Sequence, residues 1–170
     1  FRPYLLWCMY TLYQPASRWA EIAPLLTAVE AVHIFCLIQD DVLDEARIRH
    51  GTATIHSHLA HTRYRHTTRG QRAAESQAIL AGDLLLHFAW ERVMHVHKTH
   101  PHSAPQLCTT FATLVREVCL GQILDVDTAT RGAESAAVIN RKNQLKTARY
   151  SVARPLELGA LAASSTNRRA

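Results

Sequence analysis

Three aspartates at the end of an apolar stretch have the residue type and spacing expected of a cation-binding site. Asp40, Asp41 and Asp44 follow a run from 28 to 38 that is mainly apolar and contains no proline or glycine. Such a run predicts a mostly buried helix. On that helix Asp40 and Asp44 lie one turn apart on the same face, with Cβ atoms about 5–6 Å apart, and Asp41 points about 100° away.

Neighbouring carboxylates repel each other by up to about 4 kcal/mol in a partly solvated site, so a cation is expected beside them. Mg²⁺ prefers sites made of one or two carboxylates, water and substrate phosphates. We therefore predict Mg²⁺, or Mn²⁺ as the alternative ion, at these three aspartates. Arg49 follows the predicted helix, and its guanidinium is suited to bidentate binding of phosphate oxygens. The competing interpretation is a solvated acidic turn followed by a basic one.

A second set of polar residues lies in the last third of the chain. Gln122 and Asp125 are three residues apart and share one face of a predicted helix. Because leucine and isoleucine flank them, we expect both to line a polar cavity. Lys146 lies on a predicted helix that offers it few anionic partners in the nearby sequence, so phosphate is its expected partner.

Composition indicates one globular domain over residues 1–170. The chain has 48% hydrophobic and 19% charged residues, which is typical of a folded protein. The net charge is +5, but the arginines are scattered and no stacking aromatics lie between them. We therefore predict no nucleic-acid binding.

The cysteines and the apolar segments indicate a cytoplasmic protein. The four cysteines have no C-x-x-C spacing, so we expect free thiols in a reducing compartment. Neither a run of eighteen apolar residues nor a signal-peptide pattern is present in the sequence, and we predict neither a membrane span nor a signal peptide.

The elements that must position these residues are predicted to be helices, because no strand signature is evident. Glycine and proline mark the expected gaps, and Pro3 suits a first helical turn. Helices are expected at 2–13, 19–46, 71–98, 104–129 and 133–163.

Three smaller features complete the expected fold. The histidine-rich segment 56–66 has no cysteine or carboxylate to complete a zinc site, and we interpret it as a solvated loop. We interpret His95, His97, His100 and His102 as part of an interhelical connection. Gly82 predicts close helix packing, and Asp83 is expected to be a buried structural carboxylate that needs a hydrogen-bond partner.

Five segments, in order, resemble the isoprenyl diphosphate synthases, the trans-polyprenyl synthetase family. The string V-E-x-x-H-x-F-x-L-I-x-D-D-V-L-D-x-x-x-x-R-x-G at 29–51 resembles the first aspartate-rich region of that family. The other matches are the R-P of G-K-x-x-R-P at 2–3, A-G-D at 81–83, G-Q-x-L-D at 121–125 and K-T-A-x-Y-[ST] at 146–151. The chain is identified as a partial member of this family, similar to the short-chain farnesyl and geranylgeranyl diphosphate synthases and truncated at both ends.

The resemblance implies an isoprenoid-synthase-type helical bundle around a central cavity, and the condensation of isopentenyl diphosphate with an allylic diphosphate. Metal ions at the aspartates would neutralise the leaving diphosphate. Arg49 and Lys146 would add fixed positive charge there. Thr147 would stabilise the carbocation, and Gln122 would line the cavity.

The resemblance also implies a binding site for isopentenyl diphosphate, made by Arg2, His33 and His50. Position 50 departs from the family, in which an arginine is usual. Histidine cannot make the two-pronged contact of a guanidinium, so weaker and more pH-dependent binding is expected. Phe35 would close the pocket for the growing chain and so limit the product to a short one. Thr54 and His56 match a T-x-H segment that positions the loop.

The second aspartate-rich motif of the family has no counterpart in the sequence, so the helices that carry it are missing from the expected fold. The resemblance implies a homodimer. Three alternatives stay open: a non-catalytic partner subunit, an inactive fragment of a synthase, and a terpene cyclase of the same fold. The cyclase would not need His33, Arg49 or Lys146.

Overall fold

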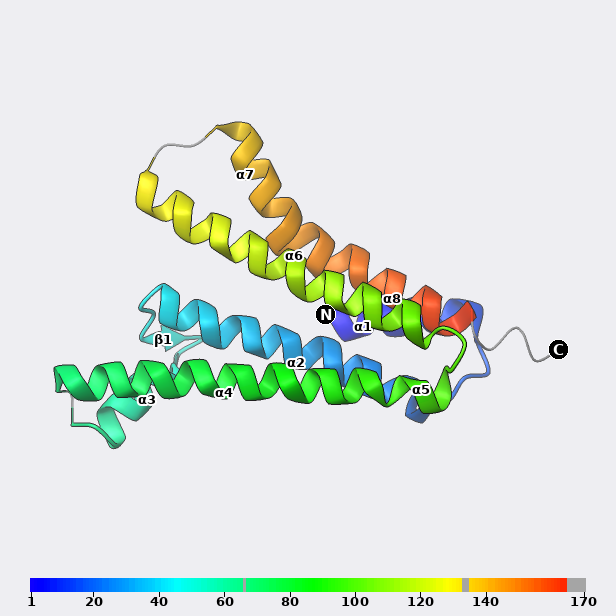
Figure 1. Cartoon of the computed structure of the whole chain (residues 1–170), viewed down its shortest axis with the longest axis horizontal. Coiled ribbons are helices and arrows are strands. Elements are labelled where there is room, and N and C mark those ends of the chain that lie inside the picture. The colour runs from blue at the N-terminus through cyan, green and yellow to red at the C-terminus, as the bar shows by residue number, and fades with distance from the viewer. Residues whose placement is uncertain (66, 133–134, 165–170) are drawn as a thin grey trace. The chain divides into compact units, whose positions relative to one another are not determined.

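The computed structural model describes residues 1–65, 67–132 and 135–164. These residues form an all-α fold with one very small hairpin, so the predicted fold class is confirmed (Figure 1). The helices are α1 (Arg2–Tyr13), α2 (Trp19–Leu43), α3 (Ile55–Thr62), α4 (Thr68–Met94), α5 (Val96–Thr99), α6 (Ala104–Arg131), α7 (Ala136–Asn143), the π-helix η1 (Gln144–Ala153) and α8 (Arg154–Ser164). The strands are β1 (Ile48–Arg49) and β2 (Thr52–Ala53).

The chain divides into two compact units. Residues 31–88 form the central unit, and residues 1–30 with 89–170 form the terminal unit. The central unit contains the second half of α2, the hairpin, α3 and most of α4. The terminal unit contains α1, the start of α2 and all the helices from α5 onward.

The core of the terminal unit lies where α1 and α6 pack against α8. Gly159 on α8 allows close approach, because a Cβ there would collide with the Leu6 carbonyl oxygen and lie 3.0 Å from Met9 Cβ. The Gln14 side chain donates a hydrogen bond of 3.0 Å to the Ala163 carbonyl at the other end of this contact. The fully buried large side chains of α1, α6 and α8 are Leu6, Tyr10, Leu107, Phe111, Leu114 and Leu158.

Helix α2 ends three residues earlier than predicted, in a Schellman motif. Glu45 has a φ of +51°, and the Ala46 and Glu45 amides donate to the Asp41 and Val42 carbonyls respectively. This pattern satisfies the last carbonyls of a helix and usually places glycine at the left-handed position. Because a glutamate stands there, no helix-stop signal is evident from the local sequence. Asp44 is therefore the residue that caps the helix.

A two-residue turn joins β1 and β2, so the prediction that no strand occurs was wrong here. Arg49 pairs with Thr52, and His50 and Gly51 between them have φ values of +50° and +78°. Positive φ at both central residues defines the type I′ hairpin turn, which usually reads Asn-Gly or Asp-Gly. Histidine is among the non-glycine residues that adopt this conformation more often, and strands of two residues leave no alternating pattern.

The histidine-rich segment after the hairpin is a helix, and its prediction as a solvated loop was wrong over Ile55–Thr62. His56 is buried, with 6% of its surface exposed, so this helix has an inward face. His66 lies outside the described residues.

The last three predicted helices are subdivided or shifted at their ends. The helix predicted at 71–98 begins at Thr68 and ends at Met94, and the short α5 follows it. Helix α6 runs two residues beyond its prediction. The segment expected as one helix from 133, whose first residues lie outside the described part, contains α7, η1 and α8 in succession. Within the predicted connection, His100 is buried.

Two helices, α2 and α6, are long and apolar enough by length and composition to cross a membrane. Core helices of soluble proteins meet the same criteria, and half of the most apolar stretch of α2 is buried inside the protein. The predicted absence of a membrane span therefore stays a prediction.

Candidate functional site

The C-terminal end of α2 gathers the three predicted aspartates, and β1 returns Arg49 to them. The Arg49 Nε donates to Asp41 Oδ1 at 2.6 Å, and its terminal nitrogen donates to Asp40 Oδ2 at 3.3 Å. Asp41 is buried and Asp44 is exposed. The hydrogen bond to Asp41 raises the pKa of Arg49 and outweighs the opposing effect of burial. Arg49 therefore supplies the positive charge that neighbouring carboxylates require.

The oxygen donors at this helix end fit Mg²⁺. Asp40 and Asp44 are one turn apart, and Asp44 lies at the exposed cap. In the part of the chain that the structure describes, no three His, Cys, Asp or Glu side chains gather to hold a metal ion by themselves. Mg²⁺ sites commonly use only one or two carboxylates and take the other ligands from water and phosphate. An ion here would depend on substrate oxygens in that way.

Thr54 and His56 anchor the loop that carries Arg49, as the resemblance implied. The Thr54 hydroxyl donates to the Ala46 carbonyl at 2.7 Å, and His56 Nδ1 lies 3.4 Å from the same hydroxyl. These contacts fix both ends of the hairpin. His50 stands at the exposed tip of the turn.

His33 and Phe35 lie on α2, two turns and about one and a half turns before Asp40. His33 is half-buried, and Phe35 is 8% exposed. Gly82 on α4 packs against this part of α2, since a Cβ there would lie 3.5 Å from the Phe35 ring and 3.0 Å from Gln39 Nε2. The predicted close packing at Gly82 is confirmed.

Asp83, next to that glycine, is exposed, and its prediction as a buried carboxylate was wrong. The residue directly after a tightly packed glycine points about 100° away from the contact. Its Oδ1 accepts a hydrogen bond of 3.4 Å from Gln39.

In the terminal unit, Asp125 on α6 binds two lysines. Lys146 donates to its Oδ2 at 2.5 Å, and Lys142 lies 2.9 Å from its Oδ1. Burial raises the pKa of Asp125, but the hydrogen bonds from the lysines outweigh burial and leave this pKa below its ordinary value. Lys146 was expected to have few anionic partners in the nearby sequence, and the carboxylate that it binds lies 21 residues away; phosphate as a further partner stays a prediction.

Lys146 and Thr147 lie in the π-helix η1, which packs along α6. A Cβ on Gly121 would lie 2.8 Å from the Lys146 backbone nitrogen, so only glycine allows this approach. Thr147 is exposed. Gln122, next to Gly121, is half-buried, and its Nε2 is buried with no hydrogen-bond partner in the part of the chain that the structure describes. π-Helical segments are rare and frequently coincide with functional sites.

Arg2 lies over the ring of Tyr150, with its Cζ 4.4 Å from the ring centroid. Its Nε is buried and has no hydrogen-bond partner among the described residues. Arg2 is therefore held against η1 through a cation–π contact, and is not a terminal arginine free in solvent. The structure thus places Arg2, Gln122, Lys146 and Thr147 in the terminal unit, and the aspartates, Arg49, His50, His33 and Phe35 in the central unit.

Sequence reasoning missed Glu117 on α6. Its side chain is buried and accepts hydrogen bonds of 2.8 Å from Arg149 and of 2.8 and 2.9 Å from Arg154. The hydrogen bonds from Arg154, opposed by burial and reinforced by Arg149, lower the pKa of Glu117 to about 2. The available signal was a carboxylate among apolar residues of a long helix, since such a group must find a partner.

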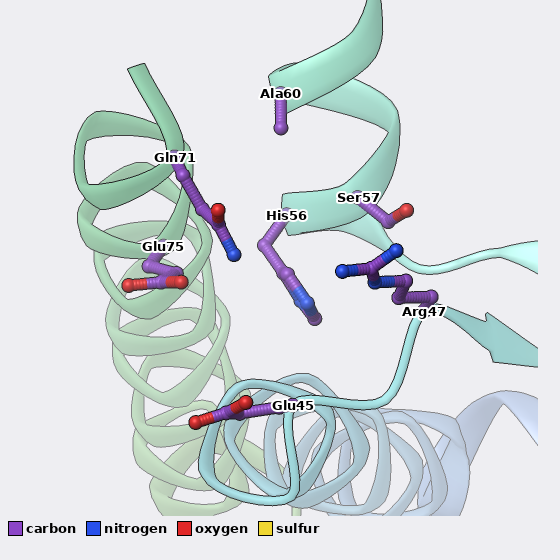
Figure 2. A pocket seen from close by; sticks show the side chains of 7 residues that line it. All are labelled: Glu45, Arg47, His56, Ser57, Ala60, Gln71 and Glu75. Atoms are coloured by element: carbon purple, nitrogen blue, oxygen red, sulfur yellow. The ribbon is translucent and has the colours of Figure 1, made fainter. Parts of the chain in front are cut away.

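The central unit also contains a polar pocket of about 110 Å³ that none of the predicted catalytic residues lines. His56 points into it from α3, and Gln71 and Glu75 reach it from α4 (Figure 2). Glu45 and Arg47, which precede the hairpin, lie on its other sides.

Comparison with known proteins identifies the chain. The model of the polyprenyl synthetase family matches residues 1–170, and the chain belongs to that family. A geranylgeranyl diphosphate synthase of Methanosarcina mazei is 33% identical over 68% of this chain and 31% of its own length. A short chain isoprenyl diphosphate synthase of Methanocaldococcus jannaschii is 32% identical over 74% of this chain and 33% of its own length.

A solved structure supports the same assignment. The geranylgeranyl pyrophosphate synthase of Corynebacterium glutamicum, complexed with isoprenyl diphosphate and magnesium, superposes with a TM-score of 0.85 at 26% identity. The match covers 96% of this chain and 47% of that protein. The chain thus spans about a third of the curated relatives and about half of the solved structure.

Proposed function

We propose that the protein is a Mg²⁺-dependent prenyltransferase that condenses isopentenyl diphosphate with an allylic diphosphate to make a short-chain prenyl diphosphate. The observation that carries the proposal is the contact of Arg49 with Asp40 and Asp41 at the end of α2, in a chain of the polyprenyl synthetase family. The names of the relatives, which include geranylgeranyl diphosphate synthases, support a short product. We further propose a cytoplasmic homodimer.

Ionisation of the allylic substrate breaks its C–O bond and leaves a diphosphate and an allyl cation. Mg²⁺ held by Asp40 and Asp44 would supply Lewis acidity toward the leaving diphosphate. The guanidinium of Arg49 now spans two carboxylates, and the same fork matches two diphosphate oxygens. Lys146, held by Asp125, adds a second fixed positive charge. Both stabilise the negative charge that develops on the leaving group.

The allyl cation is then attacked by the double bond of isopentenyl diphosphate, and loss of a proton completes the condensation. Arg2 and His50 would bind the diphosphate of this second substrate, together with His33. The carbonyl and hydroxyl of Thr147 would stabilise the cation, with Gln122 beside it on α6. Phe35 is buried on α2, and an aromatic side chain there would limit the length of the product.

Product analysis of the full-length gene product tests the proposal. We expect a prenyl diphosphate when both substrates and Mg²⁺ are present, and no product when a chelator removes the ion. Hydrocarbon formed from the allylic substrate alone would indicate a terpene cyclase. Turnover only after addition of a second polypeptide would indicate a partner subunit.

A further inference from the structure

Two arginines that bind Glu117 are five residues apart, one in η1 and one at the start of α8. Arg149 donates to Glu117 Oε1, and Arg154 donates to both carboxylate oxygens. The backbone amide of Arg154 also donates to the carbonyl of Arg149. The same two residues are therefore joined by a π-helical backbone hydrogen bond and by one buried carboxylate.

The five-residue spacing of Arg149 and Arg154 distinguishes a π-helix from an α-helix. In an α-helix, residues five apart point about 140° away from each other, so one carboxylate would not easily bind both side chains. In a π-helix the i→i+5 hydrogen bond brings such residues onto one face. Glu117 consequently binds both arginines best when the segment between them is π-helical.

The face of α6 that carries Glu117 contacts η1 near its start, at Lys146, and in its middle, at Arg149. Glu117, Gly121 and Asp125 are spaced four residues apart and lie along one side of α6. Gly121 touches the backbone of Lys146, and Asp125 binds its ammonium group. A change from π to α between 149 and 154 would rotate Lys146 and Thr147 relative to α8, and so away from these contacts.

We propose that Glu117 is a positioning residue that selects the π-helical register of η1 and thereby sets the direction of Lys146 and Thr147. The proposal deepens the proposed function and rests on it for its effect on catalysis. Among the hydrogen bonds of the described residues, Glu117 accepts only from the two arginines and from no candidate substrate-binding residue. Its effect is therefore exerted through the helix that it holds.

Glu117→Gln and Glu157→Gln form a matched pair for the test. Glu157 also binds Arg154, but it lies on α8, next to the π-helix in sequence, and its side chain is 42% exposed. In crystal structures of the full-length gene product, we expect the Arg154 amide to bond to the residue 149 carbonyl in the wild type and in Glu157→Gln. In Glu117→Gln we expect the Arg154 amide to bond to the residue 150 carbonyl.

The same pair of variants has a kinetic readout. We expect a roughly hundredfold loss of kcat/KM only in Glu117→Gln, because a shift of about 1 Å in a positioned group has that effect.

A variant that lacks the ion pairs of Glu117 tests whether a loss of activity comes from the altered position of Lys146 and Thr147 or from a less stable protein. Replacing buried ions such as Glu117 with apolar side chains of similar volume often preserves or increases stability, and an ion pair with a largely exposed side chain, such as that of Arg149, contributes little. We therefore expect Glu117→Leu/Arg149→Met/Arg154→Met to keep a wild-type unfolding midpoint but to show the α-helical bond and the same loss of kcat/KM. A π-helical bond in either Glu117→Gln or the triple variant would overturn the proposal. If the wild type forms no prenyl diphosphate, the proposed function fails. The carbonyl to which the Arg154 amide donates in each variant still shows whether Glu117 selects the π-helical form of η1.

Discussion

Gly121 on α6 and Lys146 on η1 are in backbone contact, because a Cβ on the glycine would lie 2.8 Å from the lysine nitrogen and 3.1 Å from its Cα. This contact brings the G-Q-x-L-D segment and the K-T-A-x-Y-S segment together. Two motifs separated by twenty residues in sequence therefore form one structural feature. The glycine is required by the distance between the helices, since its backbone conformation is an ordinary helical one.

Gly121→Ala is expected to destabilise the protein by about 1–3 kcal/mol, the usual effect of overpacking. The new Cβ would collide with the backbone of Lys146, which cannot move aside as a flexible side chain can. Gly82→Ala is the control: its new Cβ would meet mainly the flexible end of Gln39, and a glycine-to-alanine change inside a helix gains about 1 kcal/mol. Urea denaturation of both variants measures the difference. Equal stability of the two would contradict the role given to the contact between Gly121 and Lys146.

Acid should weaken the attachment of η1 to α6 through Glu117. Its pKa is about 2 in the folded protein and 4.5 ordinarily, so the unfolded state binds more protons between these values. The free energy of unfolding then falls as the pH drops from about 4.5 toward 2, and this contribution is fully present above 4.5. Thermal unfolding across that range should show a shallower slope in Glu117→Gln than in the wild type. An unchanged slope would show that other groups dominate acid unfolding.

The contact between Arg2 and Tyr150 predicts a difference between two substitutions. Tyr150→Phe keeps an aromatic face for the guanidinium, whereas Tyr150→Leu removes it; cation–π contacts contribute about 0.5–2 kcal/mol. We expect KM for isopentenyl diphosphate to rise several-fold in the leucine variant and to stay near wild type in the phenylalanine variant. Steady-state kinetics of the full-length gene product tests this expectation. A similar rise of KM in both variants would argue against the cation–π contact.

Removal of Arg49 should increase the affinity of the aspartate cluster for free Mg²⁺, because its guanidinium occupies Asp40 and Asp41. Without it the carboxylates repel each other more strongly and attract a cation more strongly. Titration calorimetry with Mg²⁺ alone should show tighter binding in Arg49→Ala than in Arg47→Ala, whose arginine lies in the polar pocket instead. Weaker binding in Arg49→Ala would mean that the arginine does not compete with the ion.

Phe35→Ala tests the depth of the product pocket. The ring is buried against the Gly82 region of α4, and its loss would open space along α2. We expect longer prenyl products on chromatography of the dephosphorylated alcohols. Leu80→Ala on the exposed surface of α4 is the control, and an unchanged product length in Phe35→Ala would exclude it as a length-limiting residue.

Much of the fold and the grouping of residues near Asp40 followed from local sequence. The apolar run predicted α2, and the family resemblance, now supported by the match over residues 1–170, drew attention to Arg49 and Lys146. Local patterns did not reveal the Schellman stop at Glu45 or the turn at His50, because both use non-glycine residues in left-handed conformations.

The remaining features depend on long-range packing. The π-helix arises where Glu117 binds arginines that are 32 and 37 residues away, and no periodicity of the sequence encodes such a contact. Asp125 was expected to line a cavity, and its role as the partner of two lysines required the approach of η1 at Gly121. Burial of His56 likewise depends on α3 having an inward face that the polar composition of the segment concealed.

The most direct test of the central claim is the Mg²⁺-dependent formation of prenyl diphosphate by the full-length gene product carrying Asp44→Asn or Asp127→Asn. Asp127 is an exposed aspartate paired only with Arg131 among the described contacts, and its loss should leave the rate unchanged. We expect Asp44→Asn to lower kcat/KM by at least roughly a hundredfold and to raise the Mg²⁺ concentration needed for half-maximal rate. Wild-type activity and Mg²⁺ dependence in Asp44→Asn would contradict the assignment of the α2 aspartates as the metal-binding end of a prenyltransferase.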